Sequence, residues 1–510
     1  MPSVASVGEI VERYGLSLPA EVPAFVNGAP RFINDAHALP RECPATEEAL
    51  YSLQETTPDV VEEAVAAARR IMDKSPWPRM PHAERKRVLR RIMDVLERHR
   101  DELAAIQSLE VGLPIGGVRA MHMARTIENF DFFAEVAGTV GGHTYTQTGA
   151  YLTVVTREPA GVVALLSPWN APLVLTSMKL AASLALGNAC VIKASEHSPY
   201  SVYRFVEILH EADLPPGLVN LVNGRGPVTG ASLVEHQGVD VVGFVGGSKT
   251  GAAIMAAAAK GVRKVGLELG GKSANMVMRS ADLEQAVDGS LLAILTGNGQ
   301  QCLAGSRILV EESVADEFVE RFVTRLSQVR VGDPFDARTE VGAMAFREHF
   351  AKVLAYVDTA SAEGAKVLTG GAAAPGFDKG FFFQPTAVAV EDNSLRVCQE
   401  EIFGPFVSIQ RVPDADTAIR IANESAFGLV SYIWSNDLLE VTQMSAAIKA
   451  GTVWVNTPLA RDLRAPFGGY KQSGVGRDGL ESSVELLTEE KTVMFPTSKL
   501  DLPQLGLGGD

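Results

Sequence analysis

The chain is poor in cysteine, with four among its 510 residues, and none of them belongs to a CxxC pair. Cys43, Cys190, Cys302 and Cys398 stand far apart, which argues against both a zinc site and a disulfide framework. Scattered cysteines are typical of the reducing cytosol. The first fifteen residues also lack the apolar core of a secretory signal. We therefore predict a cytoplasmic protein with no bound metal.

Positive charge is also scarce, since 46 Lys and Arg residues face 61 Asp and Glu residues, giving a formal net charge of −15. Such a surface disfavours nucleic acid or an anionic membrane as a partner. One uncharged stretch, Pro159–Met178, is about long enough to cross a bilayer, but Pro168 and Pro172 interrupt it. We interpret it as a buried strand, a loop and the start of a buried helix, and expect a small-molecule ligand instead.

Apolar residues, by contrast, are abundant at 46%, and the length suits two or three domains. Strand-like and helix-like segments alternate, which is typical of βαβ units and a parallel sheet. The rhythm resumes after residue 270, so we predict two α/β lobes. The predicted strands include Val162–Leu166, Ala189–Ile192, Val219–Val222, Val239–Val245, Asn275–Met278 and Ser306–Val310, and the predicted helices include Asp59–Met72 (with Asp59 as N-cap), Lys179–Leu186, Ser198–Ala212 and Leu283–Leu295.

Two further strand-like segments, Tyr151–Arg157 and Lys491–Phe495, belong to neither lobe. Exposed edge strands need a partner. We therefore expect them to pair across a subunit interface, in a symmetric homodimer or homotetramer.

Cys302 is the cysteine most suited to chemistry. It lies in GNGQQCLAG, residues 297–305, where small and polar residues replace the apolar surroundings of a structural cysteine. Glycines allow the close approach that a substrate needs to reach a thiol. The alternative is an inert thiol, because most isolated cysteines do no chemistry.

Glu268 stands in the apolar, glycine-rich run VGLELGGKS, residues 265–273. Desolvation there would raise its pKa toward the range of a general base. The same run satisfies the pattern of a phosphate-binding P-loop, from Gly266 to Ser273. A P-loop opens a helix, however, and the following Ala274–Met278 is strand-like.

Other loops carry polar groups at predicted strand ends. A strand followed by Gly246, Gly247 and Ser248 and then a helix forms a cradle for phosphate. Asn170, between two prolines, suits an oxyanion donor, although it could equally be a turn residue. Lys193 with Glu196, and the run Glu400–Phe406, fit a ribose at the carboxyl edge of a parallel sheet.

In this order and spacing these segments resemble the aldehyde dehydrogenase superfamily. The resemblance runs from Phe25–Gly28 to Pro466–Gly474, and its most specific blocks hold Glu268 and Cys302, 34 positions apart (302 − 268). It implies an α/β fold with a Rossmann-type cofactor lobe, an α/β catalytic lobe and a small β oligomerisation element. The implied ranges are 1–143 and 163–269 for NAD binding, 270–482 for catalysis, 144–162 and 483–500 for oligomerisation strands, and 501–510 for a tail.

The resemblance also implies roles for individual residues. Cys302 would be the nucleophile, Asn170 an oxyanion donor, and Glu268 the base that hydrolyses the thioester, since relatives that pass the acyl group to CoA lack this glutamate. Glu196 at the ribose 2′-hydroxyl favours NAD, with NADP possible. The residues expected at the cofactor are Trp169, Lys193, Glu196, Gly246, Gly247, Ser248, Gly251, Leu269, Glu401 and Phe403.

Within the superfamily, the run RDLRAPFGG, residues 461–469, looks like the hydroxymuconic semialdehyde dehydrogenases. Because their substrates carry carboxylates, Arg125 with Arg461 or Arg464 could form a clamp, unless these arginines make ordinary ion pairs. Ala171 replaces a bulky aromatic residue and predicts a wide substrate tunnel, which Gln301 and Phe467 would also line.

Several positions depart from the family pattern. Val245-Gly246-Gly247 replaces Thr-Gly-Ser, which leaves the phosphate contacts open. Asp478 replaces a glutamate thought to relay protons with the residue matching Lys179, so neither is counted as catalytic. Three alternatives remain open: the same chemistry on a neutral aromatic or aliphatic aldehyde, a P-loop nucleotide hydrolase, and an inactive structural homologue.

Overall fold

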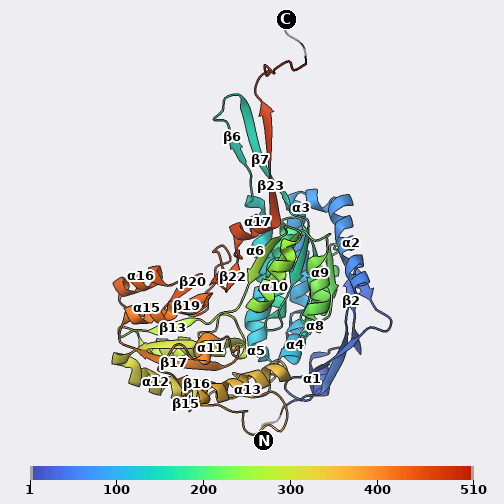
Figure 1. Cartoon of the computed structure of the whole chain (residues 1–510). Helices are drawn as coiled ribbons and strands as arrows, with labels where there is room; N and C mark the ends of the chain where they lie inside the picture. Colours follow the sequence, from blue (N-terminus) through green and yellow to red (C-terminus); the bar gives the residue numbers. More distant parts are fainter. Residues whose placement is uncertain (1–3, 507–510) are drawn as a thin grey trace.

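The computed structural model describes residues 4–506, which form two α/β lobes and a narrow sheet that projects from the first lobe (Figure 1). An eight-stranded sheet in the order β22-β12-β11-β8-β9-β10-β2-β3 organises the first lobe. The five strands from β12 to β10 run parallel, and the others are antiparallel to their neighbours. The strands are β2 (Ala24–Val26), β3 (Ala29–Arg31), β8 (Val162–Leu166), β9 (Ala189–Lys193), β10 (Val219–Val222), β11 (Val241–Val245), β12 (Lys264–Glu268) and β22 (Gly474–Val475).

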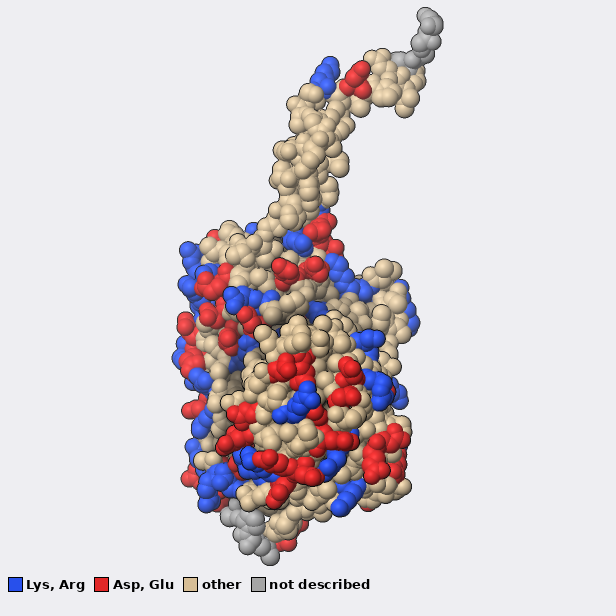
Figure 2. All heavy atoms as spheres, turned by 90° about the vertical axis from the view of Figure 1, so that its left-hand side faces the viewer, with Lys and Arg blue, Asp and Glu red and all other residues tan. Residues whose placement is uncertain are grey.

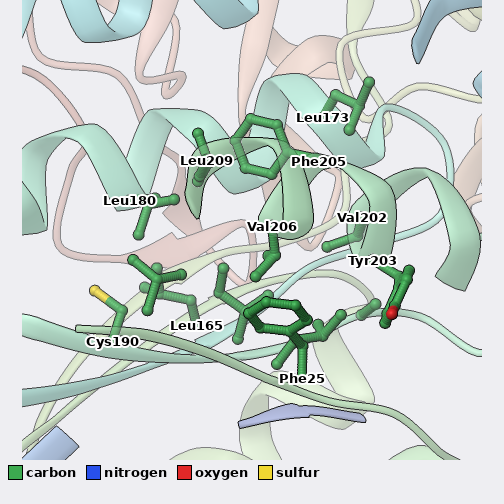
Figure 3. Packing of buried hydrophobic residues seen from close by; sticks show 14 of the residues in the cluster. Phe25, Leu165, Leu173, Leu180, Cys190, Val202, Tyr203, Phe205, Val206 and Leu209 are labelled. Atoms are coloured by element: carbon green, nitrogen blue, oxygen red, sulfur yellow. The ribbon is translucent and has the colours of Figure 1, made fainter. Parts of the chain in front are cut away.

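Every residue of β8, β9, β10 and β11 is buried, which explains why these strands are continuously apolar instead of alternating. Figure 3 shows Leu173 and Leu180 of α7 and Phe205 and Leu209 of α8 above the strand residue Leu165. Each such side chain contributes about 1.5–3 kcal/mol when fully buried. The helices of this lobe are α2 (Pro58–Lys74), α3 (His82–Arg98), α4 (Arg100–Val111), α6 (Ala124–Val136), α7 (Pro172–Ala185), α8 (Pro199–His210), α9 (Ala231–Glu235), α10 (Ser248–Ala259) and α17 (Leu480–Leu487).

A seven-stranded sheet in the order β15-β16-β17-β14-β13-β19-β20 organises the second lobe, and only β15 runs antiparallel to its neighbour. Its strands are β13 (Ala274–Val277), β14 (Arg307–Glu311), β15 (Lys366–Thr369), β16 (Thr386–Ala389), β17 (Phe406–Val412), β19 (Val430–Trp434) and β20 (Thr452–Val455). Its helices are α11 (Leu283–Leu295), α12 (Glu312–Ser327), α13 (Arg347–Ala362), α14 (Arg396–Gln399), α15 (Ala415–Asn423) and α16 (Leu438–Ala447).

Smaller elements complete these lobes. A sheet in the order β1-β5-β4 lies near the N-terminus, and β18 pairs with β21. These elements are α1 (Val7–Tyr14), β1 (Glu21–Val22), β4 (Ala38–Glu42), β5 (Ala49–Gln54), α5 (Ile115–Gly117), β18 (Phe427–Gly428) and β21 (Tyr470–Lys471). The two α/β sheets confirm the predicted fold class.

The projecting sheet, here called the arm, consists of β6 (His143–Tyr145), β7 (Tyr151–Pro159) and β23 (Thr488–Pro496). Its longest pairing joins Thr488 to Pro159 and Pro496 to Tyr151. The two segments that we expected to pair across a subunit interface therefore pair with each other within one chain. Within the described chain the outer edge of β23 has no neighbouring strand. Figure 2 shows that most of the arm's visible surface is uncharged, whereas the body carries both signs of charge.

Three details differ from or qualify the sequence-based expectations. Helix α2 begins at Pro58 with Thr57 as N-cap, so the prediction of Asp59 as N-cap was wrong; proline suits the first helical position because its fixed φ is already helical. Strand β22 falls in the range assigned to catalysis but joins the first sheet. Pro159–Met178 forms β8 and the start of α7, and no helix within residues 4–506 is long and apolar enough to span a membrane.

Candidate active site

Two loops meet between the lobes, and we call them the junction: residues 268–273 and residues 296–304. Glu268 ends β12 of the first sheet, and the chain then crosses to β13 of the second sheet. A Cβ atom at Gly271 would lie 2.4 Å from the Cys302 carbonyl oxygen, so only glycine allows this approach. Because the crossing leads into a strand, it cannot present a helix N-terminus to phosphate as a P-loop does.

The Cys302 loop is held in an unusual backbone conformation. Gly297, Asn298 and Gly299 all have positive φ, at 64°, 57° and 69°. The Asn298 side chain donates to the carbonyl oxygens of Gly112 (3.0 Å) and Ala343 (2.9 Å) and accepts from the Gly342 amide (2.8 Å). These bonds offset the cost of a left-handed asparagine, which is about 1–2 kcal/mol. They fix the backbone just before Cys302.

Cys302 is half-buried and packs against an apolar cluster that includes Leu429 and Phe467. Asn170 Nδ2 donates to the Gln300 carbonyl oxygen at 2.8 Å, which places its amide beside the loop and leaves its second N–H available. Burial, with smaller contributions from Glu401 and Glu268, raises the pKa of the Cys302 thiol to about 12. In the free protein this residue is therefore a thiol at neutral pH, and a reaction through it needs a base or a positive charge.

The Glu268 carboxyl is 5% exposed, and its Oε2 has no hydrogen-bond partner in the described structure. Burial and then the charge of Asp478 raise its pKa well above the usual range, while Lys179, Arg461 and Arg477 oppose that rise. A raised pKa makes this carboxylate a stronger base than an exposed one, as suits a general base.

Lys179 and Asp478, which were not predicted to be catalytic, both lie close enough to Glu268 to affect its pKa. The Lys179 ammonium bonds both Asp478 carboxylate oxygens, at 2.9 and 3.1 Å, and the pair is buried. Asp478 also forms a two-bond backbone bridge with Phe467. A lysine on an otherwise apolar helix face was the available sequence signal for this pair.

The predicted cofactor residues gather at the carboxyl edge of the first sheet. The Lys193 ammonium lies 3.1 Å from the Glu196 carboxylate, directly after β9. Helix α10 starts after Gly246 and Gly247 with no side-chain cap and no acidic residue in its first turn. Its free N–H groups therefore fit the pyrophosphate of a dinucleotide. Gly251 of α10 packs directly against the Leu269 side chain. A Cβ atom at Gly251 would lie 2.5 Å from Leu269 Cδ2, so the contact leaves no room for a larger residue.

Glu401 and Phe403 approach the same space from the second lobe. The Glu401 carboxylate accepts from the Gly271 amide at 2.9 Å. Phe403 has a positive φ of 65°, and its carbonyl oxygen lies 2.6 Å from His349 Nε2. The Trp169 ring lies edge-on to Phe403, with 5.3 Å between centroids. His349 was not predicted, because no motif in the surrounding sequence indicates a functional residue.

The arginines predicted as a clamp divide into two environments. The Arg461 guanidinium lies 3.8 Å from the centroid of the Phe467 ring, and its buried Nη2 has no hydrogen-bond partner among the described residues. Burial lowers its pKa, the charges of Asp478 and Glu268 oppose this, and the charge of Arg125 adds to the lowering. Arg125 is therefore within electrostatic range of Arg461, and its own Nη1 lies 3.3 Å from the Glu128 carboxylate. Arg464 instead forms bonds of 3.0 and 2.6 Å to Asp462 and has a side chain that is 75% exposed. We therefore remove Arg464 from the clamp.

Ala171 and Gln301, also predicted to line the tunnel, directly follow Asn170 and precede Cys302 in the chain. Ala171 immediately precedes α7, and Gln301 Nε2 donates to the Ala293 carbonyl oxygen at 3.4 Å. Their small or neutral side chains leave the arginines as the charged groups among the predicted substrate residues.

Comparison with known proteins identifies the family. The model of the aldehyde dehydrogenase family matches residues 32–493. This chain is an aldehyde dehydrogenase. The sequence is 41% identical over 441 residues to the 5-carboxymethyl-2-hydroxymuconate semialdehyde dehydrogenase of Escherichia coli, covering 86% of this chain and 93% of that protein.

Solved structures of other aldehyde dehydrogenases share the fold. HpcC from Thermus thermophilus superposes with a TM-score of 0.93 at 37% identity, covering 98% of each chain. An aldehyde dehydrogenase from Bacillus cereus, solved as an NAD+ complex, gives 0.93 at 34% identity, covering 97% of this chain and 100% of that one. The chain is thus an NAD(P)-dependent oxidoreductase that converts aldehydes, as the sequence predicted.

Proposed function

We propose that this aldehyde dehydrogenase oxidises a semialdehyde that bears a carboxylate, such as a hydroxymuconic semialdehyde, to the free acid. The observation that carries the proposal is Arg461, whose largely buried guanidinium stacks on Phe467 and lies within electrostatic range of Arg125. Its Nη2 has no hydrogen-bond partner among the described residues. A buried arginine is costly unless an anion accompanies it. The name of the Escherichia coli relative agrees with such a substrate.

In the proposed reaction, the Cys302 thiol gives its proton to Glu268, which releases it to solvent, and the sulfur attacks the aldehyde carbon. The Asn170 side chain and the Cys302 amide donate to the resulting oxyanion. NAD, when bound, supplies the hydride acceptor. Loss of hydride leaves the acyl group on Cys302 as a thioester. Glu268 then takes a proton from water, the water oxygen attacks the thioester carbon, and the acid and the Cys302 thiol are released.

The presence of Glu268 favours hydrolysis over transfer to CoA, because a base beside the thioester makes water the acceptor. Lys179 and Asp478 support this role, since a buried ion pair adjoining Glu268 can stabilise either of its protonation states. Glu196, Lys193 and the first turn of α10 would hold the adenine ribose and the pyrophosphate. Glu401, Phe403 and Trp169 would position the nicotinamide end.

We also propose that the arm joins chains into a homodimer or homotetramer. The outer edge of β23, nine residues long, has no neighbouring strand in the part of the chain that the structure describes, and its Met494 and Phe495 side chains are exposed. Both features support pairing with another copy.

The first test measures NADH formation with 2-hydroxymuconic semialdehyde, benzaldehyde and hexanal, with Cys302→Ala as the blank. We expect a higher kcat/KM for the acidic semialdehyde and competitive inhibition by dicarboxylic acids of similar length. A preference for hexanal or benzaldehyde, without inhibition by dicarboxylates, would keep the thioester chemistry and overturn the substrate class.

A further inference from the structure

Two loops of opposite charge lie side by side where the adenine ribose is proposed to bind. Strands β9 and β10 are neighbouring and parallel, and Lys193 pairs in register with Val222. Three residues after Lys193 comes Glu196, and three residues after Val222 comes Arg225. Because the carboxyl ends of parallel strands open onto the same edge, a carboxylate and a guanidinium occupy matching positions there.

Each of these groups is held by a partner of opposite charge. Glu196 is bound to Lys193 at 3.1 Å. Glu55 accepts from the Arg225 backbone amide (3.0 Å), from Nε (2.9 Å) and from Nη2 (2.6 Å). The Glu55 side chain is 7% exposed, whereas that of Arg225 is 47% exposed, so the guanidinium reaches from a buried carboxylate into the open edge.

The backbone before Arg225 is shaped for this contact. Gly224 has a φ of 143°, and a Cβ there would lie 2.2 Å from Thr229 Oγ1 and 3.0 Å from Glu55 Cγ. A larger residue would therefore displace both the Thr229 and the Glu55 side chains. The two ion pairs are also within electrostatic range of each other, since the charge of Glu196 favours charged Arg225 and the charge of Glu55 favours charged Lys193. Two cations and two anions therefore share the edge.

At such an edge an acidic side chain binds the 2′-hydroxyl of NAD, whereas an arginine accommodates the 2′-phosphate of NADP. This chain carries both. We propose that Arg225 determines how well NADP is accepted, by exchanging Glu55 for the 2′-phosphate, and that Glu196 and Glu55 together keep the preference for NAD. The inference rests on the proposed placement of the adenine ribose at Lys193 and Glu196.

Removal of either carboxylate should favour binding of NADP relative to NAD. Without the Glu196 charge, a 2′-phosphate would meet Lys193 and Arg225 with one anion fewer to repel it. Without the Glu55 charge, Arg225 would lose its competing partner and become available to phosphate. Without Arg225, neither change would create a phosphate site.

The test is calorimetric titration of the full-length protein with NAD and NADP in the absence of aldehyde, supported by 5′-AMP and adenosine 2′,5′-bisphosphate. The variants are Glu196→Gln, Glu55→Gln, Arg225→Gln and the double variant Glu196→Gln/Arg225→Gln. We expect Glu196→Gln to improve the Kd ratio for NADP over NAD about tenfold or more, Glu55→Gln to improve it several-fold, and Arg225→Gln to worsen it about tenfold. The gain of Glu196→Gln should vanish in the double variant.

Glu55→Gln separates a specificity role from a structural one, because a merely damaged loop would weaken both cofactors instead of improving NADP. An unchanged ratio in Arg225→Gln, or a gain that survives in the double variant, would overturn the proposal. Failure of the ribose placement would show differently: Glu196→Gln would then leave the affinities for NAD and 5′-AMP unchanged. Neither outcome depends on which aldehyde is oxidised.

Discussion

The junction and the arm are incomplete in opposite ways. At the junction, two buried polar atoms have no hydrogen-bond partner within residues 4–506: Glu268 Oε2 and Arg461 Nη2. On the arm, apolar side chains are exposed, with Met494 at 63% and Phe495 at 52%. A buried polar group is satisfied by a small polar molecule, whereas an exposed apolar strand is satisfied by another protein surface. The two regions therefore indicate two kinds of partner, a charged substrate and a second copy of the chain.

The largest expected effect comes from Glu268→Gln at the junction. We expect kcat to fall about 10²–10⁴-fold, because water loses its general base. The free energy of unfolding should also depend on pH. Because the pKa of Glu268 is raised in the folded protein, the parent protein loses stability as the pH rises and this carboxyl becomes charged, whereas glutamine stays neutral. The Tm of the variant, relative to the parent protein, should thus improve with pH. A loss of less than tenfold in kcat would contradict the role of Glu268.

The second effect concerns the thiol at the junction. Because the pKa of Cys302 is raised to about 12, its alkylation by iodoacetamide in the free enzyme should accelerate about tenfold per pH unit, or roughly a thousandfold from pH 6 to 9. Mass spectrometry of modified Cys302 would measure the rate, with Cys302→Ala as control. A plateau below pH 8 would mean that the site already stabilises the thiolate without cofactor.

Arg461→Gln tests whether the junction binds a charged substrate group. We expect kcat/KM for the carboxylate-bearing semialdehyde to fall about 10–100-fold, since a hydrogen bond between charged groups contributes about 1.5–3 kcal/mol, and kcat/KM for hexanal to change less than threefold. Arg464→Gln is the matched control, because that arginine lies three positions away and is bound to Asp462. Equal losses with both aldehydes would remove the clamp.

The smallest effect is expected on the arm. Met494→Glu or Phe495→Glu should raise the dissociation constant of the assembly about tenfold or more per substitution, since each buried apolar side chain contributes about 1.5–3 kcal/mol. Light scattering over a dilution series would measure the mass. Leu438→Glu on α16, where the leucine is 80% exposed, serves as control for a charge placed elsewhere. A parent protein that is monomeric at all concentrations would exclude the proposed assembly.

Local patterns predicted the secondary structure well where apolar runs end at clear turn residues. Strands Val162–Leu166 and Val219–Val222 and helix Leu283–Leu295 have their predicted bounds. The start of α2 was misplaced because Pro58 at the first helical position outweighed the capping signal of Asp59. The resemblance to a family, rather than any single motif, supplied the order of the lobes.

Contacts between distant residues could not be predicted in the same way. Lys179 and Asp478 are 299 positions apart, and only the fold brings them together beside Glu268. Arg461 and Arg464 have similar sequence surroundings, yet Asp462 binds Arg464 and leaves Arg461 to stack on Phe467. Such choices depend on backbone direction within a loop, which composition does not encode.

The crossing from β12 to β13 limits how this architecture can be recombined. Residues 269–273 join β12 of the first sheet to β13 of the second, and they also touch the Cys302 loop through Gly271. A chimera that exchanged the eight-stranded lobe between two relatives would have its splice point inside the catalytic machinery. It would also separate β12 from β22, which returns from the far end of the sequence. The two lobes look like separate domains, but one cannot be exchanged between relatives without further substitutions that refit it to the other.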